Sequence, residues 1–299
     1  MLSQVAPTTL AAQILAETPE LRQAAQRTQT YAQLEERCRR VILDGERSYY
    51  VLEGDLLFDE DELTIYALQK AQSQGDALVS PNTSAAIEPA PALVGIAAGN
   101  RVVRWAPDRV LGYCVIRASF PDQQQYEKVR DNMAAAAAAW EATCGVDFAY
   151  MPLHDGHPDP STPASDIDPS LVFSVRYIDA GAQFIAAAFF PTYPPDRRRV
   201  LIDPSYFAED LTFDRVGVLR HELGHVLGFR HEHIRSNAPA VCPNEPLADT
   251  VDLTAYDPKS VMHYFCGGVG SPDLKITEVD REGAQKLYGP PWDSVTLVQ

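Results

Sequence analysis

The sequence predicts an α+β fold in which a small N-terminal segment precedes a larger domain. Short apolar runs that are typical of strands are interspersed with long helical patterns, mainly over residues 110–228. The composition, 45% hydrophobic and 22% charged residues in a chain of 299, is that of a globular protein with a sizeable core. Residues 80–91, SPNTSAAIEPAP, are rich in Pro, Ser and Ala, and we interpret them as part of a linker.

This composition shift divides the chain into four regions. We place an N-terminal pro-segment-like region at residues 1–79, the linker at 80–98, the larger domain at 99–290 and a C-terminal tail at 291–299.

The N-terminal region carries three element patterns. We expect a helix over residues 9–40, a strand over 49–58 that is interrupted by a Gly54-Asp55 turn, and a short helix over 61–71.

The larger domain shows a mixture of strand and helix patterns, with a polar loop at 154–170 and a loop-rich stretch that ends near residue 270. The predicted strands are 110–119, 146–150, 171–178, 184–190 and 199–203, and the predicted helices are 121–143, 213–228 and 278–288.

The charge balance excludes some classes of partner. Acidic residues outnumber basic ones 41 to 25, which gives a net charge of −16. Such a field repels nucleic acid and anionic lipid surfaces and attracts cations, so we expect neither nucleic-acid nor membrane partners. The longest apolar run, residues 133–140, is far shorter than the ~20 residues that a membrane span needs. The N-terminus has no basic start or clean apolar stretch, so it does not read as a secretory signal.

The five cysteines lie far apart and form no Cys-x-x-Cys pair, which argues against a cysteine-only zinc site. Two disulfides and one thiol are permitted, but the count alone does not choose this arrangement. Cys242 and Cys266 bracket a loop, and we expect them to pair if the protein matures in an oxidising compartment. Cys114 and Cys144 are as consistent with buried thiols as with a second bridge.

A cluster of histidines indicates a metal site. His221 and His225 lie one turn apart on the predicted helix, so both imidazoles can reach one cation. Gly228 can take a positive φ and reverse the chain, which would bring His231 round as a third ligand. Three imidazoles leave one position of a tetrahedral zinc open for water, and Glu222 is placed to accept a proton from that water. The alternative is a surface helix with solvated histidines.

The segments HELGHVLGFRHE and SVMHY resemble the metzincin zinc endopeptidases, most closely the astacin family. The resemblance implies a domain with a twisted mixed sheet, a long backing helix and a zinc-binding helix. It implies that Met262 forms the floor of the site and that Tyr264 is a zinc ligand that swings away to hydrogen-bond the oxyanion. It also implies that Glu232 supports the mature N-terminus; a solvated loop acid is the alternative.

Residues 185–191 and 200–203 resemble a strand and the segment after it in the matrixins, but Ala187 and Leu201 stand where histidines of that family bind a structural zinc. His154 and His157 could hold a metal with nearby aspartates, although a solvated loop is the expected state. The strand 184–190 is expected either at the sheet edge, where an extended substrate could pair with it, or in the centre of the sheet.

Residues 52–55, Leu-Glu-Gly-Asp, resemble the Phe-x-Gly-Asp element of astacin pro-segments. The resemblance implies that Asp55 binds the zinc in a latent state, while a simple hairpin turn is the alternative. The whole pattern implies a monomeric zymogen, a zinc endopeptidase with one Zn²⁺ per chain that acts on proteins or peptides. It favours secretion, although no signal peptide is visible. A non-catalytic zinc-containing protein-binding module is the competing interpretation, and a metallohydrolase of other substrates is a third.

Overall fold

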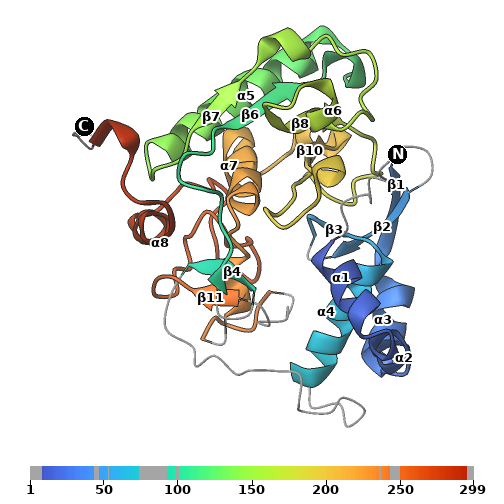
Figure 1. The fold of residues 1–299 in the computed structure, drawn as a ribbon. Helices are drawn as coiled ribbons and strands as arrows, with labels where there is room; N and C mark the ends of the chain where they lie inside the picture. Colours follow the sequence, from blue (N-terminus) through green and yellow to red (C-terminus); the bar gives the residue numbers. More distant parts are fainter. Residues whose placement is uncertain are drawn as a thin grey trace.

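A computed structural model describes residues 9–43, 47–52, 54–73, 93–98, 101–235, 237–242 and 250–294. Figure 1 shows the first part of the chain, in blue, as a lobe of its own beside the rest of the molecule. We call residues 9–73 the N-terminal unit and residues 93–294 the main domain. In the described ranges, no helix has the length and apolar character that crossing a bilayer requires.

Three short helices stand where the sequence analysis expected one helix over residues 9–40, so that expectation is wrong in detail. The chain breaks at Thr18-Pro19 and again at Thr28, whose hydroxyl accepts from the Tyr31 amide and so caps the next helix. The helices are α1 (Leu10–Glu17), α2 (Glu20–Gln26), α3 (Gln29–Arg37) and α4 (Glu60–Ser73).

The N-terminal unit also contains an antiparallel sheet of β1 (Arg39–Leu43), β2 (Arg47–Leu52) and β3 (Leu56–Phe58). The chain turns between β2 and β3 at Gly54 and Asp55, as the sequence predicted. The helices and this sheet enclose an apolar core within the unit. Its members are Ala25, Tyr31, Tyr50, Leu52, Leu63, Tyr66, Ala67 and Leu68.

The main domain is built on a mixed five-stranded sheet in the order β7-β6-β8-β10-β9, and the α+β prediction is therefore confirmed. Four strands run parallel and β9 runs antiparallel at the edge. The central strands are buried throughout, as expected of parallel strands that are covered on both faces. The strands are β6 (Leu111–Val115), β7 (Phe148–Tyr150), β8 (Leu171–Tyr177), β9 (Ala186–Ala187) and β10 (Arg199–Ile202).

The edge strand is much shorter than the predicted 184–190. It pairs with β10 over Ala186 and Ala187 only, and Ala188 then bridges in parallel to Leu56 of the N-terminal unit. The edge of the main sheet thus touches the chain's own β3 through a single bridge just beyond β9.

The long helix α5 (Gln123–Glu141) packs on α7 (Arg215–Val226), and the Trp140 indole donates to the Arg220 carbonyl oxygen at 2.9 Å. Two further helices complete the described part: the one-turn α6 (Ala164–Ile167) and α8 (Glu278–Tyr288) near the C-terminal end (Figure 1).

A third small sheet, β11-β4-β5, involves residues that the sequence analysis assigned to the linker. Most of residues 80–98 lie outside the described ranges, but β4 (Val94–Ala98) pairs with β5 (Arg101–Val102) and β11 (Thr250–Asp252). The Arg230 amide donates to the Val94 carbonyl oxygen at 2.7 Å, so β4 also holds the segment that follows α7.

The polar loop at 154–170 is fastened by Asp155, which is 1% exposed. Its carboxylate accepts the Val115 amide at 2.9 Å and the hydroxyls of Tyr126 and Tyr150, both at 2.5 Å. His154 pairs with a different carboxylate: its Nε2 atom lies 3.4 Å from Asp168 Oδ2. In the fully described loop, the histidines and aspartates therefore do not gather into a metal site.

We predict that Asp155→Ala destabilises the main domain by about 3 kcal/mol, because it leaves a buried amide and two phenols without their charged acceptor. For a domain of this size, this corresponds to a melting temperature lower by roughly 6–12 °C. Asp159→Ala, which removes an exposed carboxylate from the same loop, should change stability by less than about 0.5 kcal/mol. Equal melting temperatures of the two variants would contradict the role of Asp155.

Candidate metal centre

Helix α7 positions the first two histidines. Asp214 caps its N-terminus by accepting from the Gly217 amide at 2.6 Å. His221 and His225 lie one turn apart on its buried face, and their ring centroids are 4.9 Å apart. Met262 packs so closely on Gly224 that a Cβ there would collide with its sulfur.

The chain reverses at Gly228, which has φ +93°, a conformation that L side chains rarely adopt. The Phe229 amide donates back to the Gly224 carbonyl oxygen at 2.9 Å and closes the helix. The Ile96 amide of β4 donates to the Gly228 carbonyl oxygen at 3.1 Å. This reversal turns His231 toward the histidines of α7, as the spacing predicted.

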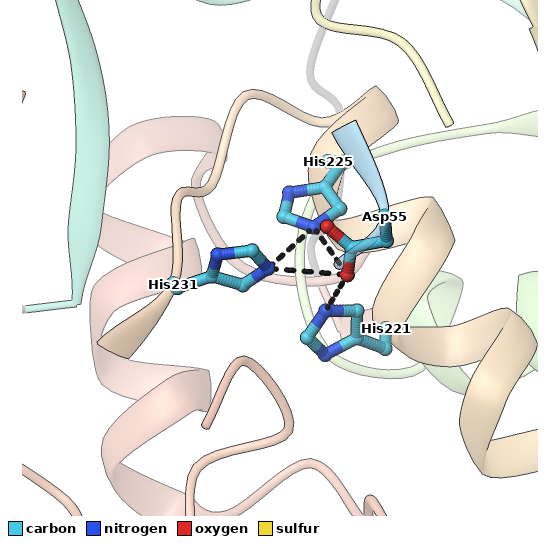
Figure 2. A group of neighbouring side chains, drawn as sticks. All are labelled: Asp55, His221, His225 and His231. Atoms are coloured by element: carbon cyan, nitrogen blue, oxygen red, sulfur yellow. Dashed lines mark hydrogen bonds and ion pairs between the residues drawn. The ribbon is translucent and has the colours of Figure 1, made fainter. Parts of the chain in front are cut away.

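Three imidazoles and one carboxylate converge on a single point (Figure 2). His221, His225, His231 and Asp55 each offer a ligand atom, and these four atoms lie within 4.8 Å of one another. Asp55 Oδ2 is 3.2 Å from the Nε2 atoms of His221 and His231 and 3.7 Å from that of His225. All four side chains are buried.

Hydrogen bonds at the outer nitrogens fix which atoms face the centre. His221 Nδ1 lies 2.7 Å from the Val261 carbonyl oxygen, and His225 Nδ1 lies 2.8 Å from that of Phe229. Since a carbonyl only accepts, each Nδ1 carries a proton and each neutral ring presents the Nε2 lone pair inward. Burial lowers the pKa of His225 to about 4, which keeps that ring neutral.

The donor set fits a divalent zinc ion. His225 Nε2 and His231 Nε2 are only 3.2 Å apart, and lone pairs packed so closely beside a carboxylate call for a cation between them. Three nitrogen donors and one oxygen donor make the four ligands that zinc takes in proteins.

Asp55 reaches the three histidines because the backbone of the preceding residue, Gly54, can lie close to Tyr264. Gly54 has φ +88°, and a Cβ there would lie 3.1 Å from the hydroxyl oxygen of Tyr264. The Tyr264 ring lies 4.2 Å from that of His231, centroid to centroid, so the tyrosine stands beside the histidines.

Glu222 faces the same site from α7 and is 2% exposed. Burial, and after it the Asp55 carboxylate, raises the pKa of Glu222 well above its usual value. Its Oε2 atom has no hydrogen-bond partner in the described part of the chain. Beside it opens a cavity of about 360 Å³, which is also lined by apolar side chains including Phe184, Phe213 and Leu274.

Asp280 supports the floor of the site, and the sequence analysis did not identify it. Its carboxylate accepts the Ser260 hydroxyl at 2.5 Å and the Val261 amide at 2.8 Å, and so fixes the turn that carries Met262. Asp280 also forms a capping box with Thr277 at the start of α8. The Thr-x-x-Asp spacing was the signal that could have identified this residue.

Glu232, which the resemblance implies supports the N-terminus of a mature form, pairs in the uncut chain with a residue of its own loop; its role in a mature form stays a prediction. Its Oε1 atom lies 3.0 Å from Nε of Arg235, and both side chains are 1% exposed. The Arg235 guanidinium also donates to the Thr254 carbonyl oxygen at 2.8 Å. Sequence reasoning assigned no role to Arg235, because its pairing depends on the turn that follows His231.

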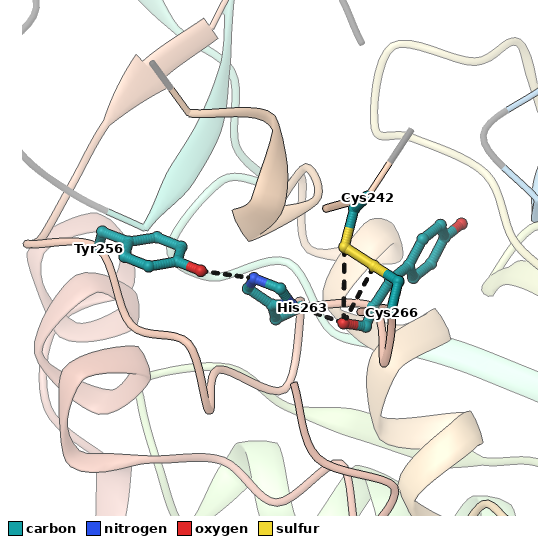
Figure 3. The surroundings of a disulfide bond; sticks show 5 residues. Cys242, Tyr256, His263 and Cys266 are labelled. Carbon is teal, nitrogen blue, oxygen red and sulfur yellow. Dashed lines mark hydrogen bonds between the residues drawn. A yellow bond between two sulfur atoms is a disulfide. The ribbon is translucent and has the colours of Figure 1, made fainter. Parts of the chain in front are cut away.

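Cys242 and Cys266 form a disulfide, with Cα atoms 5.4 Å apart, which ties residues 237–242 to the turn after Tyr264 (Figure 3). His263 Nδ1 donates to the Tyr264 carbonyl oxygen at 2.6 Å, and His263 Nε2 accepts from the Tyr256 hydroxyl at 2.8 Å. The remaining cysteines, Cys38, Cys114 and Cys144, are free thiols, and the last two are buried.

The chain is similar in sequence to known metalloproteinases. No protein-family model matches the chain. Human stromelysin-3 is 28% identical over 195 residues, which cover 62% of this chain and 32% of that protein. Human matrix metalloproteinase-16 is 24% identical over 181 residues, 55% of this chain and 24% of that protein. The chain thus spans about a third or less of the length of these relatives.

Two solved structures also resemble parts of the chain. Myroilysin matches 62% of this chain and 95% of its own, at 16% identity and a TM-score of 0.42. A hatching enzyme zinc-protease from Oryzias latipes matches 60% of this chain and 90% of its own, at 18% identity and a TM-score of 0.36. The sequence similarity to the matrix metalloproteinases confirms the resemblance to zinc metalloproteinases that the histidine motif indicated.

Proposed function

We propose that this chain is a zinc-dependent endopeptidase that its own N-terminal unit holds latent. The observation that carries the proposal is the set of three buried imidazole nitrogens beside the buried carboxylate of Glu222. His221, His225 and His231 would hold one zinc ion per chain, which would supply Lewis acidity toward a carbonyl group and toward water. The expected substrates are proteins or peptides.

Glu222 acts as the general base in this proposal. It accepts a proton from the attacking water and passes it to the leaving amine. Its buried position favours the role, because burial raises the pKa of its carboxyl above the usual value and so makes the carboxylate a stronger base. The apolar cavity beside it offers room for a non-polar side chain next to the scissile bond.

Tyr264 steadies the oxyanion. Its ring packs against His231 and its hydroxyl lies at the same face of the site as Gly54 and Asp55. Once Asp55 leaves, the phenol O–H can donate to the oxygen that becomes negative in the tetrahedral state.

Asp55 is the latency ligand. Its carboxylate takes the fourth position around the three imidazoles and so competes with the reacting groups. The same four-donor set is also the closed arrangement typical of a structural zinc, which is what a non-catalytic binding module would contain. Removal of Asp55 distinguishes the two functions.

We predict that Asp55→Ala raises the rate at which the uncut chain cleaves a quenched fluorescent peptide by at least about tenfold, because it opens the fourth position. Asp61→Ala removes a carboxylate of the same unit that pairs with Arg22, and it should leave the rate unchanged. If zinc is bound but neither variant cleaves peptides, the non-catalytic module is favoured.

Glu222→Ala, made in the Asp55→Ala chain, should keep one zinc per chain by elemental analysis and lose about 10²–10⁴-fold in kcat. The ligands are intact while proton transfer is lost. Retention of turnover in this variant would exclude Glu222 as the base.

Tyr264→Phe in the same background should lower kcat by about 10²–10³-fold with little change in KM, since only an oxyanion donor is lost. Tyr256→Phe is the matched control, because that hydroxyl contacts His263 and not the zinc ligands. Equal kcat values for the two variants would remove Tyr264 from the mechanism.

A further inference from the structure

Arg197 of the main domain is enclosed by the N-terminal unit. Its guanidinium lies 2.8 Å from Asp59 Oδ2 and 2.8 Å from Glu62 Oε2, and it donates to the Leu57 carbonyl oxygen at 3.0 Å. Only 6% of the side chain is exposed. All three acceptors belong to β3 or to the start of α4, so this one residue ties the two parts together away from the metal cluster.

Aromatic rings flank the same guanidinium from both parts of the chain. It lies 5.0 Å from the ring centroid of Tyr49 in the N-terminal unit and 4.5 Å from that of Tyr193 in the main domain. The Tyr193 hydroxyl also donates to the Leu57 carbonyl oxygen at 3.3 Å. The charge is therefore desolvated, and both of its carboxylate partners are supplied by the other part of the molecule.

A buried apolar cluster forms a second contact between the N-terminal unit and the main domain, and β1–β3 contribute to it. It contains residues of both parts, so neither part could expose its share to water without a cost. The N-terminal unit contributes Val41, Leu43, Tyr49, Val51 and Leu57, and the main domain contributes Ala180, Phe184, Ala187 and Leu201.

The N-terminal unit has, in addition, an apolar core of its own between its helices and β2. A segment with its own core and its own sheet does not need the covalent connection to keep its shape. Leu56, which is fully buried, inserts instead into the core of the main domain.

We propose that the N-terminal unit stays bound to the main domain after the connecting residues 74–92 are cut, and that Arg197 is the anchor on which this binding depends. Cutting the chain then does not by itself activate the protein. A second event, removal of the bound unit, is required. The consequence for activity rests on the proposed function, whereas the binding itself does not.

The test uses the full chain with a recognition site for a specific protease inserted between residues 80 and 91, in the Glu222→Ala background so that no self-cleavage occurs. The chain is cut to completion at pH 8, above the pKa of about 7 to which burial raises Glu62, so that its carboxylate is ionised. The two pieces are then separated by size-exclusion chromatography over a dilution series. We expect them to elute together at micromolar concentration, with and without a chelator.

Three variants distinguish the anchor from the rest of the interface. Arg197→Gln should weaken the association by at least about 100-fold, because it removes the buried cation that pairs with the largely covered Glu62 carboxylate and with the partly exposed Asp59 carboxylate. The double variant Asp59→Asn/Glu62→Gln removes both negative charges that pair with Arg197. Each new side chain keeps a carbonyl oxygen that can accept the backbone amide at the start of α4. Arg47→Gln removes the pair with Asp196, in which Arg47 is 58% exposed, and should cost at most about fivefold.

Separation of the pieces of the chain that carries only Glu222→Ala, at micromolar concentration, would overturn the proposal. Equal weakening by Arg197→Gln and Arg47→Gln, with circular dichroism unchanged, would overturn the role of Arg197. Because chromatography reads binding and not turnover, its result does not depend on the proposed function. A chain with Glu222 intact that cleaves no peptide after its N-terminal unit has been removed would refute the proposed function alone.

Discussion

Three imidazole lone pairs that meet in a buried space form the constraint on which the rest of this structure depends. The Nδ1 protons of His221 and His225 are committed to backbone carbonyls, so their Nε2 atoms can only face a cation or another donor. Several features far apart in the sequence serve this geometry. The turn at Gly228 and its contact with β4 direct His231, and Asp280 fixes the turn under Met262.

The N-terminal unit adds a carboxylate to this set of lone pairs. Asp55 places a negatively charged oxygen beside the three nitrogens, which strengthens the preference of the site for a cation. A single carboxylate would be a weak attachment if the metal were lost. The structure adds a second, metal-independent contact at Arg197 and an apolar cluster shared by β1–β3 and the edge of the main sheet. In our proposal, latency depends on Asp55 and attachment on Arg197, two residues in different contacts.

The sequence predicted what depends on local spacing. The α+β class, most helices and the relation to metzincins follow from periodicity and from one dense motif, in which the histidines and Gly228 lie within eleven residues. Contacts that depend on the folded chain could not be predicted. The Glu232–Arg235 pair, the Asp280 support and the Arg197 anchor join charged residues whose partners are set by turns or by distant segments. The strand at 184–190 was predicted too long: only Ala186 and Ala187 pair with β10, and the apolar character of Phe189 and Phe190 reflects their burial in the core of the main domain.

The most direct test of the central claim is X-ray absorption spectroscopy of the zinc-loaded full-length chain, compared with its Asp55→Ala variant. The account predicts a four-coordinate zinc with three imidazole nitrogens at about 2.0–2.1 Å and one carboxylate oxygen, and the loss of the carboxylate contribution in the variant. Fewer than three imidazoles, sulfur ligation, or identical spectra for the two proteins would contradict it.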